Sequence, residues 1–543
     1  MHLRASSPLH NLLRLMAALT LVACGIALSA CSTVTIYEEE PETPVGQIVP
    51  SKLAIVHTAG MADSFDATDT SLGIAAVAQL SRDLEEDGYD VMLLDSGNTL
   101  ASPEGLDFSD AEVPVAYLNA AGYDATLASA GELGMGRDLI HQRSKQASFS
   151  LLSSNLMDTT SGELALASTQ VVKLKDGRKV GVFAMTAPDD LEMIGPFEAS
   201  GLEADWESLV ASAQKNVDEL REQGCLLVIC LSDLDRSAEG PLGPHELAGR
   251  VSGIDFVLDV SDSQWNETRI TDASDGHPLV VETPEGLSSV SVVTWERGVS
   301  GAKPIDVGTY DGSDEQVQAL VTQTDIETDT QLKGALTKSS FELSSEASET
   351  GESALGDLVA DAMLWTAQGG PDSSASAAII DSASIAAGLG KGNITRADAL
   401  GCCPHASTRL YTVETSGRDL QSALSDQLAG EQGASIQVAG MTIELADAKN
   451  SPNATRASIK TIDGKDFSPT ATYTVVITGN ALFGDSALAK LAADDLSNVT
   501  SLNTSAGKAL CGYLSHKCKP TVPGSYQKSE GRIAQEKADT KSD

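Results

Sequence analysis

Carboxylates that follow apolar segments are the side chains in this sequence most suited to bind a divalent cation. Two such pairs are present, Asp233 with Asp235 and Asp259 with Asp262. Oxygen donors of this type bind Ca²⁺ and Mg²⁺. However, the chain has 77 acidic residues against 36 basic ones and a net charge of −41. In so acidic a sequence we interpret the pairs as solvated loop residues.

The negative charge also restricts the partners. It repels phosphate backbones and anionic lipid headgroups, so we predict no nucleic-acid partner and no peripheral membrane binding. No Gly-x-Ser-x-Gly elbow, P-loop or Gly-x-Gly-x-x-Gly segment is present in the sequence, and these are the common signals for a serine nucleophile or a phosphate cradle.

Eight cysteines are present, and two of them, Cys24 and Cys31, lie in an N-terminal apolar segment. The other six are Cys225, Cys230, Cys402, Cys403, Cys511 and Cys518. Their spacings do not resemble a zinc site. Outside the cell they could form disulfides, but six thiols allow fifteen pairings, so we predict none in particular.

The first thirty residues have the three parts of a secretory signal. Arg4 and Arg14 give a basic start, and the apolar run Leu15–Ala30 is shorter than the roughly 20 residues of a spanning helix. The run ends in Leu28-Ser29-Ala30-Cys31. This segment resembles the lipobox of bacterial lipoproteins, whose cysteine is diacylated and becomes the new N-terminus.

Leu21-Val22-Ala23-Cys24 also matches the lipobox pattern. We favour Cys31 because it leaves a fuller apolar core before it and a polar segment directly after it, and Cys24 stays open as the alternative. We therefore predict a lipoprotein signal peptide at 1–31 and a flexible tether at 32–51. The expected location is the extracytoplasmic face of the cell membrane, to which the lipid anchors the chain.

Apolar runs and helical periodicity alternate along the rest of the chain. Short apolar strands at 53–56, 91–95, 180–184 and 226–229 alternate with amphipathic helices such as 74–87 and 206–223. This order predicts an α/β domain at 52–310. A mostly polar helix predicts a connector at 311–338, followed by a smaller α/β domain at 339–515. The polar end, 516–543, is predicted to be a disordered tail.

Several segments, in order, are similar to one known family. They are Leu94–Asn98, Leu118–Ala125, Glu352–Ala362, Glu414–Leu420 and Tyr473–Val476. Together they resemble the 5′-nucleotidase family, in which a metallophosphoesterase domain precedes a nucleotide-recognising C-terminal domain. The resemblance covers nearly all of residues 52–490. It implies an N-terminal metallophosphoesterase-like αββα sandwich, a helical connector and a smaller α/β C-terminal-like domain.

The resemblance also implies two divalent metals such as Mn, Zn or Mg, which generate a hydroxide nucleophile. The positions that match the family's metal site are Gly60, Ala62, Asn98, Ala130, Gly131, Asp233, Ser261 and Ser263. Glycine, alanine and serine cannot replace an imidazole ligand. Only the neighbouring Glu132 keeps the family's residue, and Asn98 with Asp233 would form at best a weak site. We therefore predict no metal, no cofactor and no catalytic residue.

The positions that match the family's nucleotide site have changed in the same way. The resemblance places an arginine at Ala386 and two stacking aromatic rings at His405 and Ala487. Purine nucleotide recognition requires a cationic clamp and flat rings. We therefore expect that nucleotides are not recognised here in the family's manner.

Three hypotheses follow. The first is a surface-anchored, non-catalytic 5′-nucleotidase-like lipoprotein, a monomer that acts as an extracellular binding or scaffolding module. The alternative is a divalent-metal-dependent nucleotide phosphohydrolase with unconventional ligands such as Asn98, Glu132 and Asp233. The third is a receptor whose interdomain cleft binds something other than nucleotides. The sequence does not identify the small-molecule or protein ligand.

Overall fold

The structure is a computed structural model. It describes residues 52–62, 64–101, 110–234, 241–261, 267–271, 278–348, 350–369, 375–403, 408–429, 436–447, 455–492 and 496–536. The predictions for the signal peptide, the tether, Cys24, Cys31, Ser263 and His405 lie outside these residues. Within the described part of the chain, no helix is long and apolar enough to cross a membrane.

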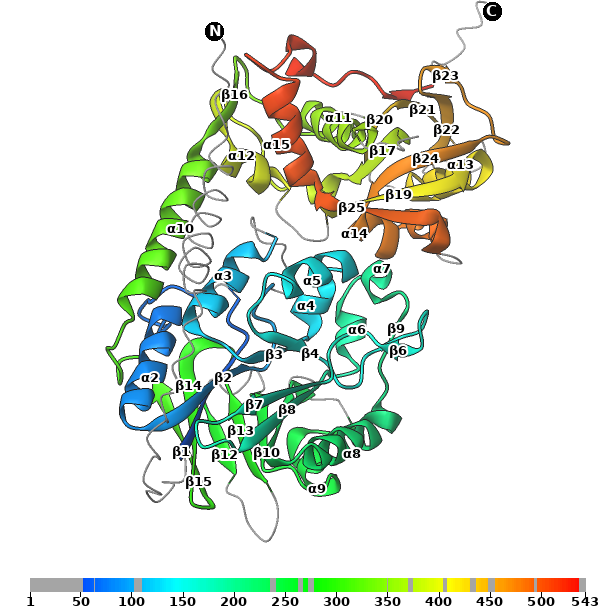
Figure 1. Ribbon diagram of the computed structural model, residues 1–543. Helices are drawn as coiled ribbons and strands as arrows, with labels where there is room; N and C mark the ends of the chain where they lie inside the picture. Colours follow the sequence, from blue (N-terminus) through cyan, green and yellow to red (C-terminus); the bar gives the residue numbers. More distant parts are fainter. Residues whose placement is uncertain are drawn as a thin grey trace, which may run out of the picture. The chain divides into compact units, whose positions relative to one another are not determined.

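The first of two six-stranded sheets in the N-terminal region has the order β15-β14-β1-β2-β3-β4. Its strands are β1 (Lys52–Ala59), β2 (Tyr89–Asp95), β3 (Ala125–Leu127), β4 (Ser150–Leu152), β14 (Gly286–Glu296) and β15 (Val299–Asp306). β1 to β4 are parallel, and β14 is antiparallel to β1. The helices α2 (Ile74–Glu86), α3 (Glu112–Ala121) and α10 (Glu315–Lys333) pack against one another beside this sheet (Figure 1).

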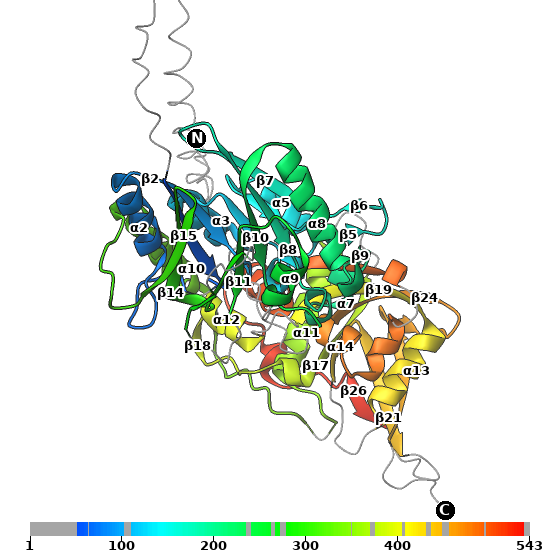
Figure 2. The same cartoon turned by 90° about the horizontal axis from the view of Figure 1, so that it is seen from below.

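The second sheet has the order β12-β13-β11-β10-β8-β7. Its strands are β7 (Thr169–Lys173), β8 (Lys179–Met185), β10 (Cys225–Ser232), β11 (Phe256–Val260), β12 (Arg269–Thr271) and β13 (Leu279–Thr283). Figure 2 shows α8 (Trp206–Glu222) and α9 (Pro244–Arg250) beside β8 and β10. Short elements complete the region: α4 (Ala130–Gly134), α5 (Arg137–Ser144), α6 (Asp190–Met193), α7 (Pro196–Ala199), β5 (Met157–Asp158), β6 (Glu163–Leu164) and β9 (Leu202–Glu203).

Alternation of side chains explains how the two sheets form a sandwich. In β1, Leu53 and Ile55 belong to the core between the sheets, whereas Ala54 and Val56 face the core under α2 and α3. In β8, Val182 faces the same central core and Phe183 packs under α8. Successive side chains of a strand point to opposite faces, so strands that are apolar on both faces need a cover on each side. The predicted α/β fold class is confirmed.

A five-stranded sheet of order β20-β17-β24-β19-β25 organises the C-terminal region. Its strands are β17 (Ala375–Asp381), β19 (Arg409–Ser416), β20 (Ile436–Ala439), β24 (Thr472–Thr478) and β25 (Val499–Ser505). A four-stranded sheet has the order β23-β22-β21-β26, with β21 (Met441–Asp447), β22 (Thr455–Ile462), β23 (Lys465–Asp466) and β26 (Ile533–Gln535), and β16 (Ala335–Ser339) pairs with β18 (Gly392–Thr395). The helices are α11 (Ala354–Gln368), α12 (Arg396–Cys402), α13 (Gly417–Gln427), α14 (Gly479–Phe483) and α15 (Ala506–His516), with short 3₁₀ turns at Ser382–Ser384, Ala487–Leu491, Leu496–Asn498 and Gly524–Gln527.

Two apolar cores lie on the two faces of this sheet. Ala378 and Ile380 of β17 pack with α11 and α15, whereas Ala377 and Ile379 pack on the side of α13 and β22. The six described cysteines are all buried free thiols. In the interior a thiol behaves as a small apolar group, which agrees with the buried positions of these residues.

The prediction of a disordered tail over 516–543 is wrong for residues 516–536, which are ordered. β26 pairs in parallel with β21, and Ile533 and Tyr526 are buried. Arg532 donates through both Nη atoms to the two carboxylate oxygens of Asp361, at 2.9 and 2.7 Å, and also to the carbonyl of Val438 at 2.8 Å. The polar composition of this segment suggested disorder, because its partners lie on α11 and β20, far away in the sequence.

We expect Arg532→Lys to lower the free energy of unfolding by about 1–2 kcal/mol. A single ammonium cannot keep both Asp361 contacts and also reach Asp357, whose Oδ1 lies 3.6 Å from the arginine Nε. Urea denaturation of the full-length chain measures the change. Arg456→Lys, at an exposed position of β22, is the control and should change stability by less than about 0.5 kcal/mol. Equal effects of the two substitutions would contradict the role given to Arg532.

Candidate functional site

The candidate site lies where the parallel strands of the two N-terminal sheets end. The carboxyl ends of parallel strands meet at one edge of a sheet, and ligands commonly bind there. β1, β2 and β3 bring Gly60, Asn98 and Gly131 to this edge of the first sheet. β10 and β11 bring Asp233 and Ser261 to the corresponding edge of the second sheet.

Glu132 is fully buried, and its carboxylate is occupied by hydrogen bonds from its own surroundings. The backbone N–H groups of Asn98, Thr99, Leu100 and Ser129 donate to it at 2.8–3.2 Å. The hydroxyl of Ser129 donates as well, at 3.2 Å. The side chain therefore joins the loop after β2 to the start of α4, and both of its oxygens are already used.

Asn98 is held in the same network. Its backbone is in the left-handed region, with φ 52°, and its Oδ1 accepts from the backbone N–H of Gly131 at 2.6 Å and from Ser129 Oγ at 2.9 Å. Its Nδ2 is buried and has no hydrogen-bond partner among the described residues. The oxygen of Asn98 that could bind a metal is thus directed at the backbone of α4.

Gly131 and Gly60 leave no room for a ligand side chain. A Cβ atom built on Gly131 would lie 2.1 Å from the carbonyl oxygen of Ala101 and 2.8 Å from Asn98 Oδ1. At Gly60, where φ is +57°, a Cβ would lie 2.9 Å from Cβ of Glu285. Protein interiors do not tolerate such distances, so neighbouring atoms occupy the space that a side chain would need.

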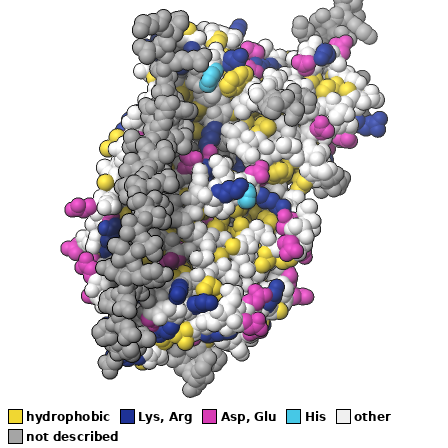
Figure 3. Space-filling view, in the orientation of Figure 1, with side chains coloured by type: hydrophobic (Ala, Val, Ile, Leu, Met, Phe, Trp, Pro, Cys, Tyr) yellow, Lys and Arg dark blue, Asp and Glu magenta, His cyan; other side chains and the backbone are white. Residues whose placement is uncertain are grey.

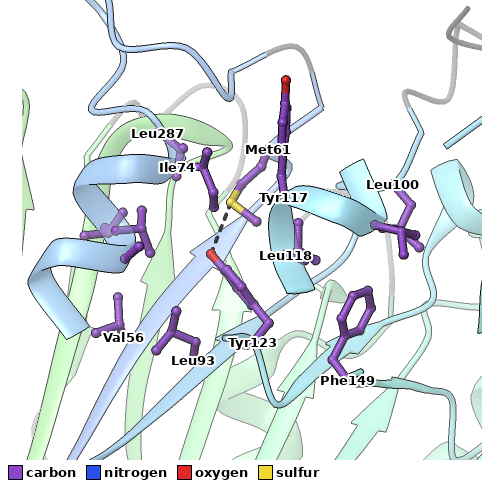
Figure 4. Close-up of a cluster of buried hydrophobic side chains, with 14 of the residues drawn as sticks. Val56, Met61, Ile74, Leu93, Leu100, Tyr117, Leu118, Tyr123, Phe149 and Leu287 are labelled. Atoms are coloured by element: carbon purple, nitrogen blue, oxygen red, sulfur yellow. Dashed lines mark hydrogen bonds between the residues drawn. The ribbon is translucent and has the colours of Figure 1, made fainter. Parts of the chain in front are cut away.

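Apolar packing fills the rest of this edge. Met61 is fully buried, and Tyr123 donates its hydroxyl hydrogen to the Met61 sulfur at 3.3 Å (Figure 4). Figure 4 shows Ile74 and Leu118 in the same cluster. Next to Met61, Ala62 donates its backbone N–H to the carbonyl of Asn98 at 3.3 Å. The methyl group of Ala62 offers no donor atom to a cation.

His57 and Asp95 are buried titratable groups at the ends of β1 and β2. The two ring nitrogens of His57 lie 2.7 Å from Thr283 Oγ1 and 2.9 Å from Ser96 Oγ. Burial lowers the pKa of His57 to about 3, so its ring is neutral. Burial raises the pKa of Asp95 to about 7, against hydrogen bonds from Thr126 and Thr58 that lower it. Both side chains therefore serve the packing of strand ends.

We expect Asp95→Asn to gain stability relative to the unchanged protein as the pH rises. The pKa of Asp95 is about 7 in the folded protein and near 4 in the unfolded chain. Between these pH values the folded protein holds one more proton than the unfolded chain, so the stability of the unchanged protein falls as the pH rises from about 4 to about 7. Asparagine has no such proton to lose. Between pH 5 and pH 8 the variant should gain about 3 kcal/mol relative to the unchanged chain.

The comparison with the variant is needed because His57 acts in the opposite direction. Its pKa is lowered on folding, so its contribution to stability increases as the pH rises from about 3 towards 6.5. Since His57 is present in both proteins, it cancels in the difference. Thermal and urea unfolding at pH 5 and pH 8 provide the test, and a pH-independent difference would show that Asp95 is ionised throughout.

In the second sheet, Asp233 is fully buried and its Oδ1 accepts from the backbone N–H of Ala187 at 2.8 Å. The backbone N–H of Ser261 donates to the carbonyl of Thr283 at 2.8 Å. Asp259 Oδ2 accepts from Ser232 Oγ and from the backbone N–H of Leu234. Asp259 is fully buried as well, so the interpretation of Asp233 and Asp259 as solvated loop residues is wrong, and Asp235 and Asp262 lie outside the described residues. The two buried carboxylates support the ends of β10 and β11.

The residues at this edge do not fit the two divalent metals that the sequence resemblance implies. Among the described residues there is no group of three or more histidine, cysteine, aspartate or glutamate side chains that could hold a metal ion. Ala130 and Gly131 offer no side-chain donor, and Glu132 and Asn98 direct their oxygens at backbone N–H groups. Among the described residues, the donor set at this edge therefore does not match the one that two divalent metals require.

Two of the positions that the resemblance assigns to nucleotide recognition, Ala386 and Ala487, make backbone hydrogen bonds within the C-terminal region. The backbone N–H of Ala386 donates to the carbonyl of Cys402, and that of Ala487 to Gln427 Oε1. The serines at the end of β17 are hydrogen-bonded instead: Gln437 Nε2 donates to Ser382 Oγ at 2.8 Å and Asn480 Nδ2 to Ser384 Oγ at 2.7 Å. These serines directly follow β17 and precede Ala386.

A family model agrees with this part of the structure. Residues 328–489 match the model described as "5'-nucleotidase, C-terminal domain". Over these residues the chain is similar to a 5′-nucleotidase C-terminal domain. This domain begins within α10 and includes α11 to α14 together with the central strands β17, β19, β20 and β24.

Curated relatives extend the similarity into the N-terminal region. The chain is 26% identical over 281 residues to the trifunctional nucleotide phosphoesterase YfkN of Bacillus subtilis, a match that covers 49% of this chain and 18% of that protein. It is 25% identical over 202 residues to the 5′-nucleotidase of Vibrio cholerae, covering 36% and 35% of the two chains. The matches thus span about a fifth to a third of the length of these relatives.

Solved structures that match this chain include the 5′-nucleotidase precursor from Thermus thermophilus. It is 20% identical, with a TM-score of 0.46, and the match covers 90% of this chain and all of that one. The NAD nucleotidase of Haemophilus influenzae is 14% identical, with a TM-score of 0.48, and the match covers 89% and 99% of the two chains.

A buried ion pair joins the C-terminal region to the N-terminal region, and it was not predicted from the sequence. Arg409 at the start of β19 donates through Nη1 to Glu198 Oε1 of α7 and through Nη2 to the carbonyl of Gly134 at 2.9 Å. Tyr411 donates its hydroxyl hydrogen to the same Glu198 oxygen at 2.7 Å. The charged partners are 211 residues apart, and no local pattern indicates such a contact.

Proposed function

We propose that this chain is a non-catalytic 5′-nucleotidase-like protein that acts as a binding or scaffolding module. The observation that carries the proposal is the closed strand-end edge, where backbone atoms occupy the space beside Gly131 and the Glu132 carboxylate accepts from four backbone N–H groups. Hydrolysis of a phosphate ester in the manner of the family needs two metals and an activated water at this edge. Fold by itself does not carry that activity.

The alternative is a metal-dependent nucleotide phosphohydrolase, which the similarity to a nucleotide phosphoesterase and to a 5′-nucleotidase favours. Metal content and turnover of the full-length chain separate the two. The protein is treated with EDTA, incubated with excess Mn²⁺, passed over a desalting column, and assayed with AMP and with bis-p-nitrophenyl phosphate. We expect far less than one bound metal per chain and no turnover above buffer.

Asn98→Ala and the exposed Asn393→Ala serve as matched variants. One or two metals per chain, with turnover that is lost in Asn98→Ala and kept in Asn393→Ala, would overturn the proposal and support the alternative. Turnover with bound metal that both variants keep would also overturn the proposal and would show that Asn98 is not a ligand.

We also propose that a lipid on Cys31 holds the protein at the extracytoplasmic face of the cell membrane, with Cys24 as the alternative acylation site. The support is the sequence Leu28-Ser29-Ala30-Cys31 at the end of an apolar run. Mass spectrometry of the mature N-terminus should find a diacylated Cys31, and Cys31→Ser should release the protein from the membrane fraction. An unmodified mature N-terminus would contradict the anchor.

The charge distribution agrees with a proposed monomeric module that does not bind nucleic acid. On the face drawn in Figure 3, basic side chains are scattered among acidic ones and do not form a continuous area. With a net charge of −41 for the whole chain, a polyanionic partner would have to overcome strong repulsion. Sedimentation of the full-length chain in detergent is expected to show one copy per particle.

A further inference from the structure

A cleft of about 770 Å³ lies beside the Arg409–Glu198 pair. One wall consists of the start of α5 and the end of α7, with Arg137, Asp138 and Phe197. The other wall is formed by β25 and the turn before it. Its volume falls within the roughly 300–1,000 Å³ that small-molecule sites occupy. Asn98 and Gly131, at the strand-end edge described above, do not line it.

The β25 wall is uncharged and rich in hydrogen-bonding groups. Thr500, Ser501 and Asn503 line this wall, and their side chains carry hydroxyl and amide groups. These residues follow the end of the family match at residue 489, so the matched domain does not include this wall. Hydroxyl and amide side chains can donate and accept at once, which suits a ligand that carries several hydroxyl groups.

Both arginines of the cleft are already paired. Arg409 is buried and uses its two Nη atoms on Glu198 and on the carbonyl of Gly134. Arg137 donates to Asp158 Oδ2 at 3.1 Å and to the carbonyl of Ser200 at 3.2 Å. The charges of the two arginines are thus already balanced by Glu198 and Asp158, and an anionic ligand would also meet the exposed carboxylate of Asp138. A phosphate group is therefore disfavoured here.

Phe197 supplies the apolar surface of the cleft. The ring is half-buried, and its edge-to-face contact with Tyr411, with centroids 5.3 Å apart, holds it in place. A ring held in this way costs little conformational entropy when a ligand packs on it. A flat apolar surface next to hydroxyls, an amide and a carboxylate matches the two faces of a sugar ring, whose C–H groups pack on aromatics and whose hydroxyls hydrogen-bond.

We propose that this cleft binds a neutral saccharide, with the ring on Phe197 and its hydroxyls on Asp138, Thr500, Ser501 and Asn503. The inference rests on the proposed non-catalytic function and specifies the ligand class of the binding module. Saccharide binding at this position would contact the N-terminal region and β25 together, so it would tighten the connection that Glu198 and Arg409 already make.

Isothermal titration calorimetry of the full-length chain tests the proposal with five probes. Maltotriose, chitotriose and xylotriose represent neutral saccharides, adenosine represents a neutral nucleoside, and inorganic phosphate represents an anion. We expect saturable binding of at least one trisaccharide, tighter than that of adenosine and of phosphate. Failure of all three trisaccharides, or tighter binding of adenosine or phosphate, would overturn the proposal.

Variants locate the binding in this cleft. Phe197→Leu keeps apolar volume against Tyr411 but removes the flat ring, and Asp138→Ala removes the exposed carboxylate. Each should weaken saccharide binding about tenfold. Phe197→Leu also loses the edge-to-face contact with Tyr411 and should lower the thermal midpoint slightly, so binding is measured well below the midpoint of each variant. Thr470→Val, an exposed position outside the cleft, is the control and should leave the affinity unchanged. Binding that survives both cleft variants would place the saccharide elsewhere and overturn the assignment.

The two proposals fail separately. Turnover of AMP with bound Mn²⁺ would overturn the non-catalytic function, whatever the calorimetry shows. Absence of saccharide binding in a chain that also lacks turnover would overturn only the ligand class.

Discussion

Replacing Gly131 by alanine should lower the free energy of unfolding by about 4 kcal/mol or more. The added Cβ would lie 2.1 Å from the carbonyl oxygen of Ala101, and this neighbour is backbone, which cannot rotate away as a side chain can. The substitution would also push on Asn98 Oδ1, which accepts from the N–H of residue 131. Urea denaturation measures the loss, and failure to accumulate as folded protein would be its extreme form.

The same geometry predicts that Gly131→His, which introduces the imidazole that the family resemblance expects, destabilises the protein and restores no activity. Gly249→Ala is a suitable control because Gly249 lies in α9 with nothing within 4 Å of the built Cβ. That substitution should be neutral or stabilising by up to about 1 kcal/mol. If Gly131→Ala were as well tolerated as Gly249→Ala, the strand-end edge would not be closed as described.

Replacing Arg409 by methionine should cost about 3–5 kcal/mol. The substitution leaves the buried Glu198 carboxylate without its cation and with only Tyr411 as a described donor. It also leaves the carbonyl of Gly134 without the Nη2 donor. The loss should appear in urea unfolding as a lower midpoint. Lys333→Met is the control, since the Lys333–Asp329 pair is largely exposed and should be worth less than about 1 kcal/mol.

A double-mutant cycle distinguishes the ion pair from the packing of the arginine stem. Glu198→Gln together with Arg409→Met removes both charges, so the double variant should be more stable than the sum of the single losses predicts. Additive losses would mean that the two charges do not stabilise each other, and the contact would then be simple packing. Because the cycle compares variants of one chain, the effect of the changed stem cancels.

Much of the fold could be predicted because it depends on local patterns. The continuous apolar residues of Val180–Ala184 indicate a strand covered on both faces, and β8 has that environment. The predicted helix at 206–223 corresponds to α8, whose N-cap Asp205 accepts from the backbone of Ser208. The tail was mispredicted because β26 depends on a partner strand about ninety residues earlier, which no short window contains.

The candidate site also has features that the sequence predicts and features that only the tertiary structure shows. The sequence alone determined that imidazole and thiolate donors are missing at Gly60, Ala62, Ala130 and Gly131, because the chemistry of a side chain is a property of the residue itself. Only the tertiary structure decided what Glu132 does, since its oxygens are used by a loop thirty residues away. Only the tertiary structure shows that Glu198 contacts Arg409 and that β25 and α5 line one cleft. Contacts between residues far apart in the sequence depend on packing and not on local periodicity.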